Sequence, residues 1–235
     1  MNRSIALRAF KITIPVLFGY LAIGIPFGLL VVKAGYPWWL APVMSILMYA
    51  GAGQYMAIGL FSAGASLSTL LVTTLLVNIR HIIYGLSLIN PFKGTGRWKP
   101  YLIFALTDET YALMTGCEPP PGSDPGSFYG LVALFDHLYW ITGTVIGAVV
   151  GTLIPFPLEG IDFALTALFV VLLMDQLQKR ENRMSAVIGI CCGIAALLAF
   201  GPGHMLIAAL AMGIACLALF HGAVSRGESR ERAES

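Results

Sequence analysis

Long apolar stretches recur along almost the whole chain, and they constrain its fold more than any other feature. A helix needs about 20 apolar residues to cross the hydrocarbon core of a bilayer. Only 11% of the residues are charged and 57% are hydrophobic, so few side chains are available to solvate a surface in water. The sequence predicts an all-α polytopic membrane protein. Its candidate hydrophobic segments are 12–33, 38–62, 66–89, 101–116, 127–154, 160–178, 184–200 and 204–220.

These segments form one membrane domain over residues 1–220, with about seven to eight hydrophobic segments of the length that spanning requires. The last residues, 221–235, are rich in Arg, Glu and Ser. A segment of this composition cannot bury enough apolar surface to fold, so we expect a polar, disordered tail.

Two interruptions share the pattern Gly-x-Gly followed by a polar residue. Segment 38–62 contains Ala50-Gly-Ala-Gly-Gln54 at its centre, and Gly201-Pro-Gly-His204 separates the last two segments. Where a membrane helix breaks, the N–H groups of the next half-helix attract an anion, and broken helices in both halves of a chain are typical of transporter sites. The sequence therefore favours at least one broken or re-entrant helix, and an inverted repeat is a further hypothesis. The alternatives are an unbroken helix with a face of small residues and a tight interfacial turn.

Basic residues predict which loops face the cytoplasm. They place the N-terminus and the 90–100 loop on that side: Arg3, Arg8, Lys11, Lys93, Arg97 and Lys99. The 117–127 loop has acids but no Lys or Arg, which predicts the outside. An even number of crossings must separate two cytoplasmic regions, but three hydrophobic segments lie between the N-terminus and the 90–100 loop. We therefore expect segment 38–62 to enter the membrane and return to the same side. Later basic residues would require a second irregularity, which we expect near 127–154.

Ionisable side chains inside apolar segments mark candidate sites, because a charge at the bilayer centre costs about 2.5–3.5 kcal/mol on insertion scales. Asn78, Arg80 and His81 form the first group. Arg80 suits a carboxylate, either of a substrate or of an internal ion pair that locks two helices together. Asp108 and Glu109 form the second group, which could bind an ammonium group or carry a proton. Adjacent helical residues differ by about 100° in direction, so both face one site only if the helix unwinds there.

Asp136 and His137 form the third group, and an Asp/His step in a membrane helix could relay protons. The candidate proton-coupling residues are Asp108, Glu109, Asp136 and His137. The candidate substrate-binding residues are Gly51, Gly53, Gln54, Asn78, Arg80, His81, Asp108 and Glu109. The cysteines show no metal-like spacing, and the sequence contains no nucleophile elbow, metalloprotease helix or phosphate loop. We therefore expect no metal, no cofactor and no enzymatic activity.

Four motifs in order make the chain resemble a known family. They are Gly24-Ile-Pro-Phe-Gly28, Tyr49-Ala-Gly-Ala-Gly-Gln54, Asn78-Ile-Arg-His-x-x-Tyr-Gly85 and Thr107-Asp-Glu109. Together they resemble the AzlC family, the large subunits of bacterial branched-chain amino acid exporters, over about residues 10 to 220. Members commonly read Ala-Gly-Ala-Ala-Gln where this chain has Gly53 before Gln54, and the extra glycine should loosen the break.

The resemblance implies a secondary transporter that exports leucine, isoleucine and valine, with methionine as a further candidate, and that uses the proton gradient. It also implies a small AzlD-like membrane partner and an inner-membrane location, and the basic residues predict a cytoplasmic N-terminus. The alternative function is a channel or a structural subunit of a transport complex, and an intramembrane enzyme is less favoured. The modest net charge of +2 gives no reason to expect a nucleic-acid partner.

Overall fold

The computed structural model describes residues 3–154, 170, 173–174, 177, 183–201 and 205–219. The chain divides into two compact units, an N-terminal unit of Met1–Ala164 and a C-terminal unit of Leu165–Ser235. Within the described residues the secondary structure is helical and no strand occurs, which confirms the all-α prediction. Four of the described helices are long and apolar enough to cross a membrane: α1 (Arg3–Lys33), α4 (Leu67–Ser87), α7 (Pro125–Leu153) and α9 (Arg183–Phe200).

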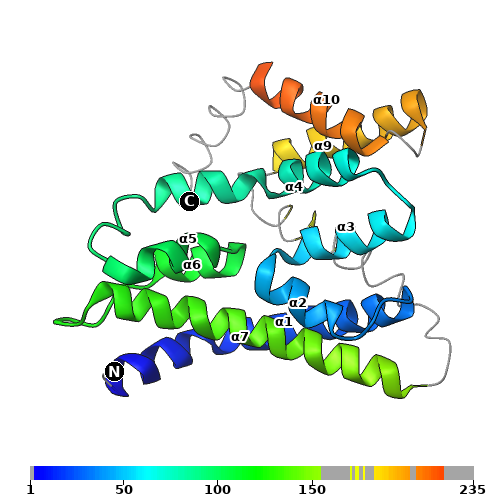
Figure 1. The fold of residues 1–235 in the computed structure, drawn as a ribbon. Coiled ribbons are helices and arrows are strands. Elements are labelled where there is room, and N and C mark those ends of the chain that lie inside the picture. The colour runs from blue at the N-terminus through cyan, green and yellow to red at the C-terminus, as the bar shows by residue number, and fades with distance from the viewer. Residues whose placement is uncertain are drawn as a thin grey trace. The chain divides into compact units, whose positions relative to one another are not determined.

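Helices α1 and α7 lie side by side and run in the same direction (Figure 1). A Cβ atom on Gly24 would lie 3.3 Å from the Cα of Gly143, and a Cβ on Gly151 would lie 3.2 Å from the Cβ of Val32. Residues later in α1 therefore contact residues later in α7, which occurs only when two helices run in parallel. Glycine permits this close approach because it has no side chain, a common device between membrane helices.

The segment 38–62 is broken, as the sequence predicted. It forms α2 (Leu40–Leu47) and α3 (Gly51–Ser62), joined by the unwound residues 48–50, and we call the whole of residues 40–62 hairpin A. The break lies just before the glycines, which form the first turn of α3.

Hairpin A starts and finishes at the same end of α1. Phe61, near the end of α3, packs edge-to-face on Tyr36, which precedes α2, with ring centroids 6.3 Å apart. Tyr36 follows α1 directly, and its N–H donates to the carbonyl of Val31. Hairpin A therefore turns back halfway instead of crossing, which agrees with the expected re-entrant geometry.

A second broken hairpin follows α4. A short 3-10 helix, η1 (Gly96–Trp98), leads into α5 (Lys99–Phe104), and α6 (Asp108–Gly116) follows after the unwound residues 105–107. We call residues 99–116 hairpin B. The break falls next to the acidic pair, and this is the condition under which both carboxylates could reach one site.

Hairpin B starts and finishes at the opposite end of the α1–α7 pair. A Cβ on Gly126, at the start of α7, would collide with the backbone of Thr95, so the loop before hairpin B lies there. After hairpin B, the carbonyl of Glu118 accepts a hydrogen bond from Arg8 Nη2 at 3.4 Å, near the start of α1. Figure 1 shows α1 and α7 on one side of the two hairpins and α4 on the other.

This arrangement corrects two topological predictions. The second irregularity is hairpin B rather than segment 127–154, because α7 is one continuous helix of 29 residues. The 117–124 loop lies at the same end as the N-terminus, so the two cannot face opposite sides of a membrane. The sequence argument treated 101–116 as one hydrophobic segment and took the missing Lys and Arg of the 117–127 loop as a sign of the outside, whereas 101–116 is divided into α5 and α6 and returns to the same end.

The C-terminal unit contains the helical hairpin formed by α9 (Arg183–Phe200) and α10 (Met205–Leu219). Cys192 Sγ lies 3.9 Å from Cys216 Sγ, which sets the two helices antiparallel. Residues 202–204 of the second predicted interruption, most of the expected segment 160–178 and the expected tail at 221–235 lie outside the described residues.

Candidate functional site

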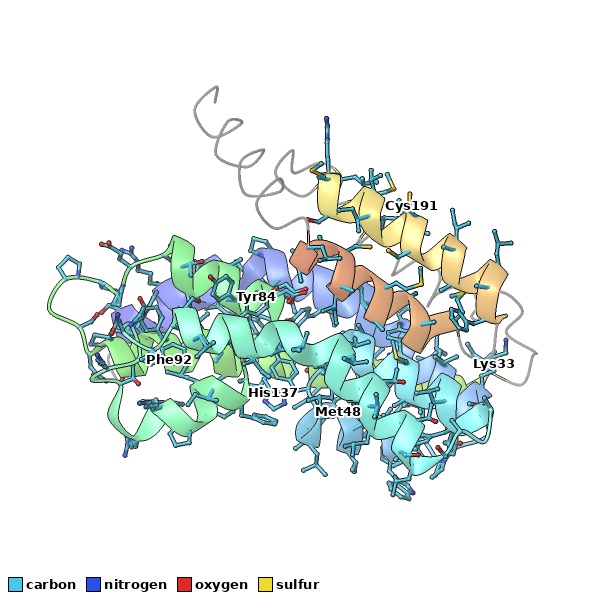
Figure 2. The ribbon with its side chains drawn as sticks, turned by 90° about the horizontal axis from the view of Figure 1, so that it is seen from above. Lys33, Met48, Tyr84, Phe92, His137 and Cys191 are labelled. Atoms are coloured by element: carbon cyan, nitrogen blue, oxygen red, sulfur yellow. The ribbon has the colours of Figure 1, made fainter. Side chains whose placement is uncertain are left out.

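Buried polar side chains gather where the tips of hairpins A and B meet α1 and α7. In Figure 2, Met48 and His137 lie midway along the N-terminal unit, between Phe92 toward one end and Lys33 toward the other. The buried polar residues of this junction are Tyr20, Ser45, Tyr49, Gln54, Thr107, Thr110, Asp136, His137 and Thr144. Polar groups at such depth in a membrane protein require partners inside the protein, so their hydrogen bonds define what the junction can do.

Neutral hydrogen bonds fix hairpin A to α7. Gln54 is fully buried, and its Oε1 accepts from Trp140 Nε1 at 2.8 Å. Its Nε2 donates to Ser45 Oγ at 3.1 Å, and Ser45 Oγ donates to Thr144 Oγ1 at 3.0 Å. Both ends of the Gln54 amide thus bridge α2, α3 and α7, which positions hairpin A. The predicted contact of Gln54 with substrate stays a prediction.

His137 links the two hairpins. Its Nε2 lies 3.0 Å from the backbone carbonyl of Ser45 in α2, and its Nδ1 lies 3.0 Å from the hydroxyl of Tyr101 in α5. A carbonyl can only accept, so Nε2 carries a proton. The imidazole also stacks on the ring of Tyr49, with centroids 4.2 Å apart.

Carboxylates, in contrast, fix hairpin B. Thr107 caps α6, because its hydroxyl accepts from the N–H of Thr110 at 3.2 Å. The hydroxyl of Thr110 donates to Asp136 Oδ2 on α7 at 2.9 Å, and the hydroxyl of Tyr20 on α1 donates to Glu109 Oε2 at 2.9 Å. Two acid groups therefore join the tip of hairpin B to both long helices.

Two buried polar atoms at the junction have no hydrogen-bond partner among the described residues. They are Asp136 Oδ1 and the hydroxyl of Tyr49. Asp136 is fully buried and Tyr49 is 4% exposed. A buried carboxylate is costly unless a proton or a cation neutralises it, so Asp136 requires one of the two at this position.

The glycines of hairpin A occupy positions where a side chain has no room. A Cβ on Gly53 would lie 2.9 Å from Asn78 Nδ2 and 3.0 Å from Met48 Cε. A Cβ on Gly51 would lie 3.2 Å from Trp140 Cη2. Ala50 supplies no side-chain cap, so the first N–H groups of α3 stay available to a ligand or to water.

On α4, only part of the predicted group Asn78, Arg80 and His81 lies at the junction. Asn78 lies against Gly53, but its Nδ2 donates to the carbonyl of Thr74. His81 Nδ1 lies 3.1 Å from the carbonyl of Asn78, and its ring packs against Tyr84. The Arg80 side chain lies outside the described part of the chain, so its expected contacts are untested.

The structure thus brings together Gly51, Gly53, Gln54, Glu109, Asp136 and His137, with Asp108 half-buried at the start of α6. Sequence reasoning missed the hydroxyl groups that connect them: Tyr20, Ser45, Tyr101, Thr107, Thr110 and Thr144. One signal was present, since Thr107 followed by two acids is the signature of a helix start. It would have placed the break before Asp108.

Long apolar helices around two broken hairpins, with a polar junction at mid-length, define a polytopic membrane protein with interrupted helices. Comparison with known proteins agrees with this class. The chain belongs to the AzlC family, whose model, described as AzlC protein, matches residues 15–154.

The relatives cover most of the chain. An uncharacterized membrane protein of Helicobacter pylori is 42% identical over 90% of this chain and 93% of its own length. The branched-chain amino acid transport protein AzlC of Bacillus subtilis is 35% identical over 86% of this chain and 80% of its own. The inner membrane protein YgaZ of Escherichia coli is 27% identical over 78% and 79%, respectively. No solved structure gives a significant match.

Proposed function

We propose that this protein is a secondary transporter that exports leucine, isoleucine and valine, with methionine as a further candidate substrate. The observation that carries the proposal is the polar junction, at which unwound tips of two hairpins meet halfway along apolar helices. Membership of the AzlC family and the name of the Bacillus subtilis relative support the substrate class. A closed structural subunit would not need a buried carboxylate oxygen that lacks a partner among the described residues, as Asp136 Oδ1 does.

A zwitterionic amino acid matches the chemistry of the junction. The uncapped first turn of α3, at Gly51 and Gly53, offers N–H groups and a positive helix end to the substrate carboxylate. The acids at the tip of hairpin B, Asp108 and Glu109, offer negative charge to the substrate ammonium. Met48, which lies against Gly53, offers apolar surface to an aliphatic side chain.

The remaining candidates complete the substrate site. Asn78 lies beside Gly53, and Arg80 and His81 follow it on α4. A guanidinium group at this depth suits a bidentate interaction with the substrate carboxylate.

Proton coupling is part of the same proposal. A carrier driven by the proton gradient needs an acid that exchanges its proton during the cycle, and Asp136 and Glu109 at the junction are suited to this role. Asp108 and His137 are the other candidates.

The fold suggests a consistent topology in the inner membrane. With a cytoplasmic N-terminus, α1 crosses outward, α4 returns, and the basic 90–100 loop is cytoplasmic. Hairpin A then inserts from outside and hairpin B from the cytoplasm, and this opposite insertion supports the inverted-repeat hypothesis. Helix α7 then crosses outward.

A small AzlD-like membrane subunit is the proposed partner. The apolar face of α4 is suited to contacts within the membrane, because large side chains along it are exposed: Leu67, Leu71, Leu75, Ile82 and Leu86.

Export is tested in cells that lack other leucine exporters and are fed a leucine-containing dipeptide. Cells with this protein should release leucine, and cells without it should accumulate leucine and grow poorly. Gly53→Leu should reduce release about tenfold or more, because the new side chain would displace Asn78 and Met48. Gly59→Leu, in the same helix but with open space around it, is the matched control.

Reconstituted vesicles separate a carrier from a channel. A carrier shows saturable leucine counterflow, in which leucine inside accelerates the uptake of labelled leucine. Equal leucine efflux with and without the protein in cells, together with no counterflow in vesicles, would reject the proposed function.

A further inference from the structure

Five side chains at the junction form an unbroken chain of oxygen atoms between two acids. Successive oxygens are separated by 2.9, 2.7, 3.0 and 2.9 Å. In order, the chain is Glu109 Oε2, Tyr20 OH, Thr107 Oγ1, Thr110 Oγ1 and Asp136 Oδ2. Three hydroxyl groups therefore connect a carboxyl group on α6 with one on α7, through α1 and the cap of α6.

Counting hydrogens shows that this chain is one proton short when both acids are charged. It has four oxygen–oxygen links but only three hydroxyl hydrogens, one each on Tyr20, Thr107 and Thr110. The N–H of Thr110 also donates to Thr107 Oγ1, but it fills none of the four links. One link would then bring two lone pairs together at hydrogen-bond distance. A single added proton, on either acid, completes all four hydrogen bonds.

We propose that Glu109, Tyr20, Thr107, Thr110 and Asp136 form a relay that holds one proton and passes it between Glu109 and Asp136. This inference rests on the proposed proton-coupled transport and deepens it.

The transfer balances without any other reactant. When Glu109 carries the added proton, it donates to Tyr20, Tyr20 donates to Thr107, Thr107 to Thr110 and Thr110 to Asp136. Each donor then releases its hydrogen to the next oxygen, so the O–H bond of Glu109 breaks and a new one forms on Asp136. The result is Glu109 as carboxylate, Asp136 as carboxylic acid, and every hydrogen bond reversed. Thr107 accepts two hydrogen bonds and donates one in both states, which an sp³ hydroxyl permits.

The two ends of the relay differ in a way that gives it a direction. Glu109 is partly exposed, whereas Asp136 is fully buried and its Oδ1 has no partner among the described residues. Glu109 is therefore the end that exchanges protons with water, and Asp136 is the end at which protonation changes the interior of the protein.

Other titratable groups surround the relay on each element that packs against it. They are Asp108 on α6, Tyr49 at the tip of hairpin A, Tyr101 on α5 and His137 on α7. The Tyr49 hydroxyl faces Tyr20 and Thr110. Among the described hydrogen bonds, Glu109 is reached through Tyr20 and Asp136 through Thr110, so removing either of these two hydroxyls interrupts the relay.

Transport in reconstituted vesicles tests the relay, because exchange and proton-driven accumulation depend on it differently. Leucine counterflow requires no net proton movement, whereas accumulation driven by a pH gradient does. Tyr20→Phe removes the hydroxyl but keeps the ring that packs on Trp140. We expect pH-driven accumulation to fall about tenfold or more while counterflow falls less than about threefold. Thr110→Val should behave in the same way, and Thr110→Ser, which restores the hydroxyl, should recover the accumulation.

Tyr139→Phe is the matched control, since the Tyr139 hydroxyl is buried in α7 but bonds to Thr13 outside the relay. It should leave both measurements unchanged. The relay is wrong if Tyr20→Phe and Thr110→Val accumulate leucine as the wild type does. It is also wrong if the wild type shows counterflow without pH-driven accumulation, a result that leaves the transporter intact. Absence of both activities in the wild type would instead reject the proposed function.

Infrared spectroscopy tests the proton count even for variants that transport poorly. The wild type at neutral pH should show the C=O band of a protonated carboxyl group. The double variant Glu109→Gln/Asp136→Asn should lack one such band, and Glu118→Gln, which changes an exposed acid, should keep it. Identical carboxyl bands in the wild type and the double variant would overturn the proposal.

Discussion

At the scale of single residues, the junction is held by side chains in unusual positions. Tyr49 has a φ of 40°, a left-handed conformation that costs a non-glycine residue about 1–3 kcal/mol. Its ring compensates by stacking on His137 and meeting Tyr20 edge-to-face. Gln54 is equally constrained, because its amide is fully buried between Trp140 and Ser45.

Replacing Gln54 by Met should destabilise the protein without changing the volume of the side chain much. The indole N–H of Trp140 and the hydroxyl of Ser45 would each lose a buried partner, which costs about 1–3 kcal/mol per unsatisfied group. The midpoint of thermal unfolding in detergent should therefore fall.

A double-mutant cycle with Trp140→Phe checks the cause. Because the two residues share one hydrogen bond, the combined variant should lose less stability than the sum of the single variants. Strictly additive losses would show that the bond does not hold hairpin A.

At the scale of elements, close contact between α1 and α7 is the framework on which both hairpins rest. Gly28 packs so tightly that a Cβ there would collide with the backbone of Thr144 and Ala148. Gly147 meets the backbone of Ile25 in the same way. The two helices together carry Tyr20, Asp136, His137 and Trp140, so their spacing fixes the width of the junction.

Gly28→Ala should weaken this framework, whereas Gly19→Ala in the same helix should not. The methyl group at position 28 forces the backbones apart, at a cost of about 1–3 kcal/mol. Position 19 has open space around it, and alanine is the better helix former there. Thermal unfolding in detergent should show a lower midpoint for Gly28→Ala only. Equal midpoints for the two variants would contradict the parallel contact.

At the scale of the whole molecule, the decisive feature is that hairpins A and B enter the N-terminal unit from opposite ends. Three long helices of this unit, α1, α4 and α7, have the length and apolarity that crossing a membrane requires. The ring of Tyr49 at the tip of hairpin A lies 6.5 Å from that of Phe104 at the tip of hairpin B, measured between centroids. The two tips thus meet from opposite ends of the unit, a geometry that suits the proposed transport by alternating access.

Side-specific labelling of single cysteines tests this topology in a chain whose four native cysteines have been replaced. Cysteines at Arg3 and Glu118 should react from one side of the membrane. Cysteines at Trp38 and Ser62, which lie beyond α1 and at the end of hairpin A, should react from the other. All four positions are exposed, so failure to label would not arise from burial. Reaction of positions 3 and 118 from opposite sides would show that α1 and α7 are not parallel.

The sequence by itself determined the all-α membrane class and the break in segment 38–62, and it singled out the acids Glu109 and Asp136 as candidates. These features follow from local composition: apolar length, helix-breaking glycines, and the high cost of charge in hydrocarbon. The order of motifs also determined the AzlC family.

Only the tertiary structure showed that α5 and α6 form a hairpin instead of one helix long enough to cross. The length and hydrophobicity of this segment are compatible with both arrangements. The tertiary structure also decided that Gln54 is a structural bridge and that Tyr20, Thr107 and Thr110 join two acids. Hydroxyl groups are common in membrane helices, and nothing in their spacing along the chain reveals a partner on another helix. A hydrogen bond between α1 and α6 exists only once both are placed against α7.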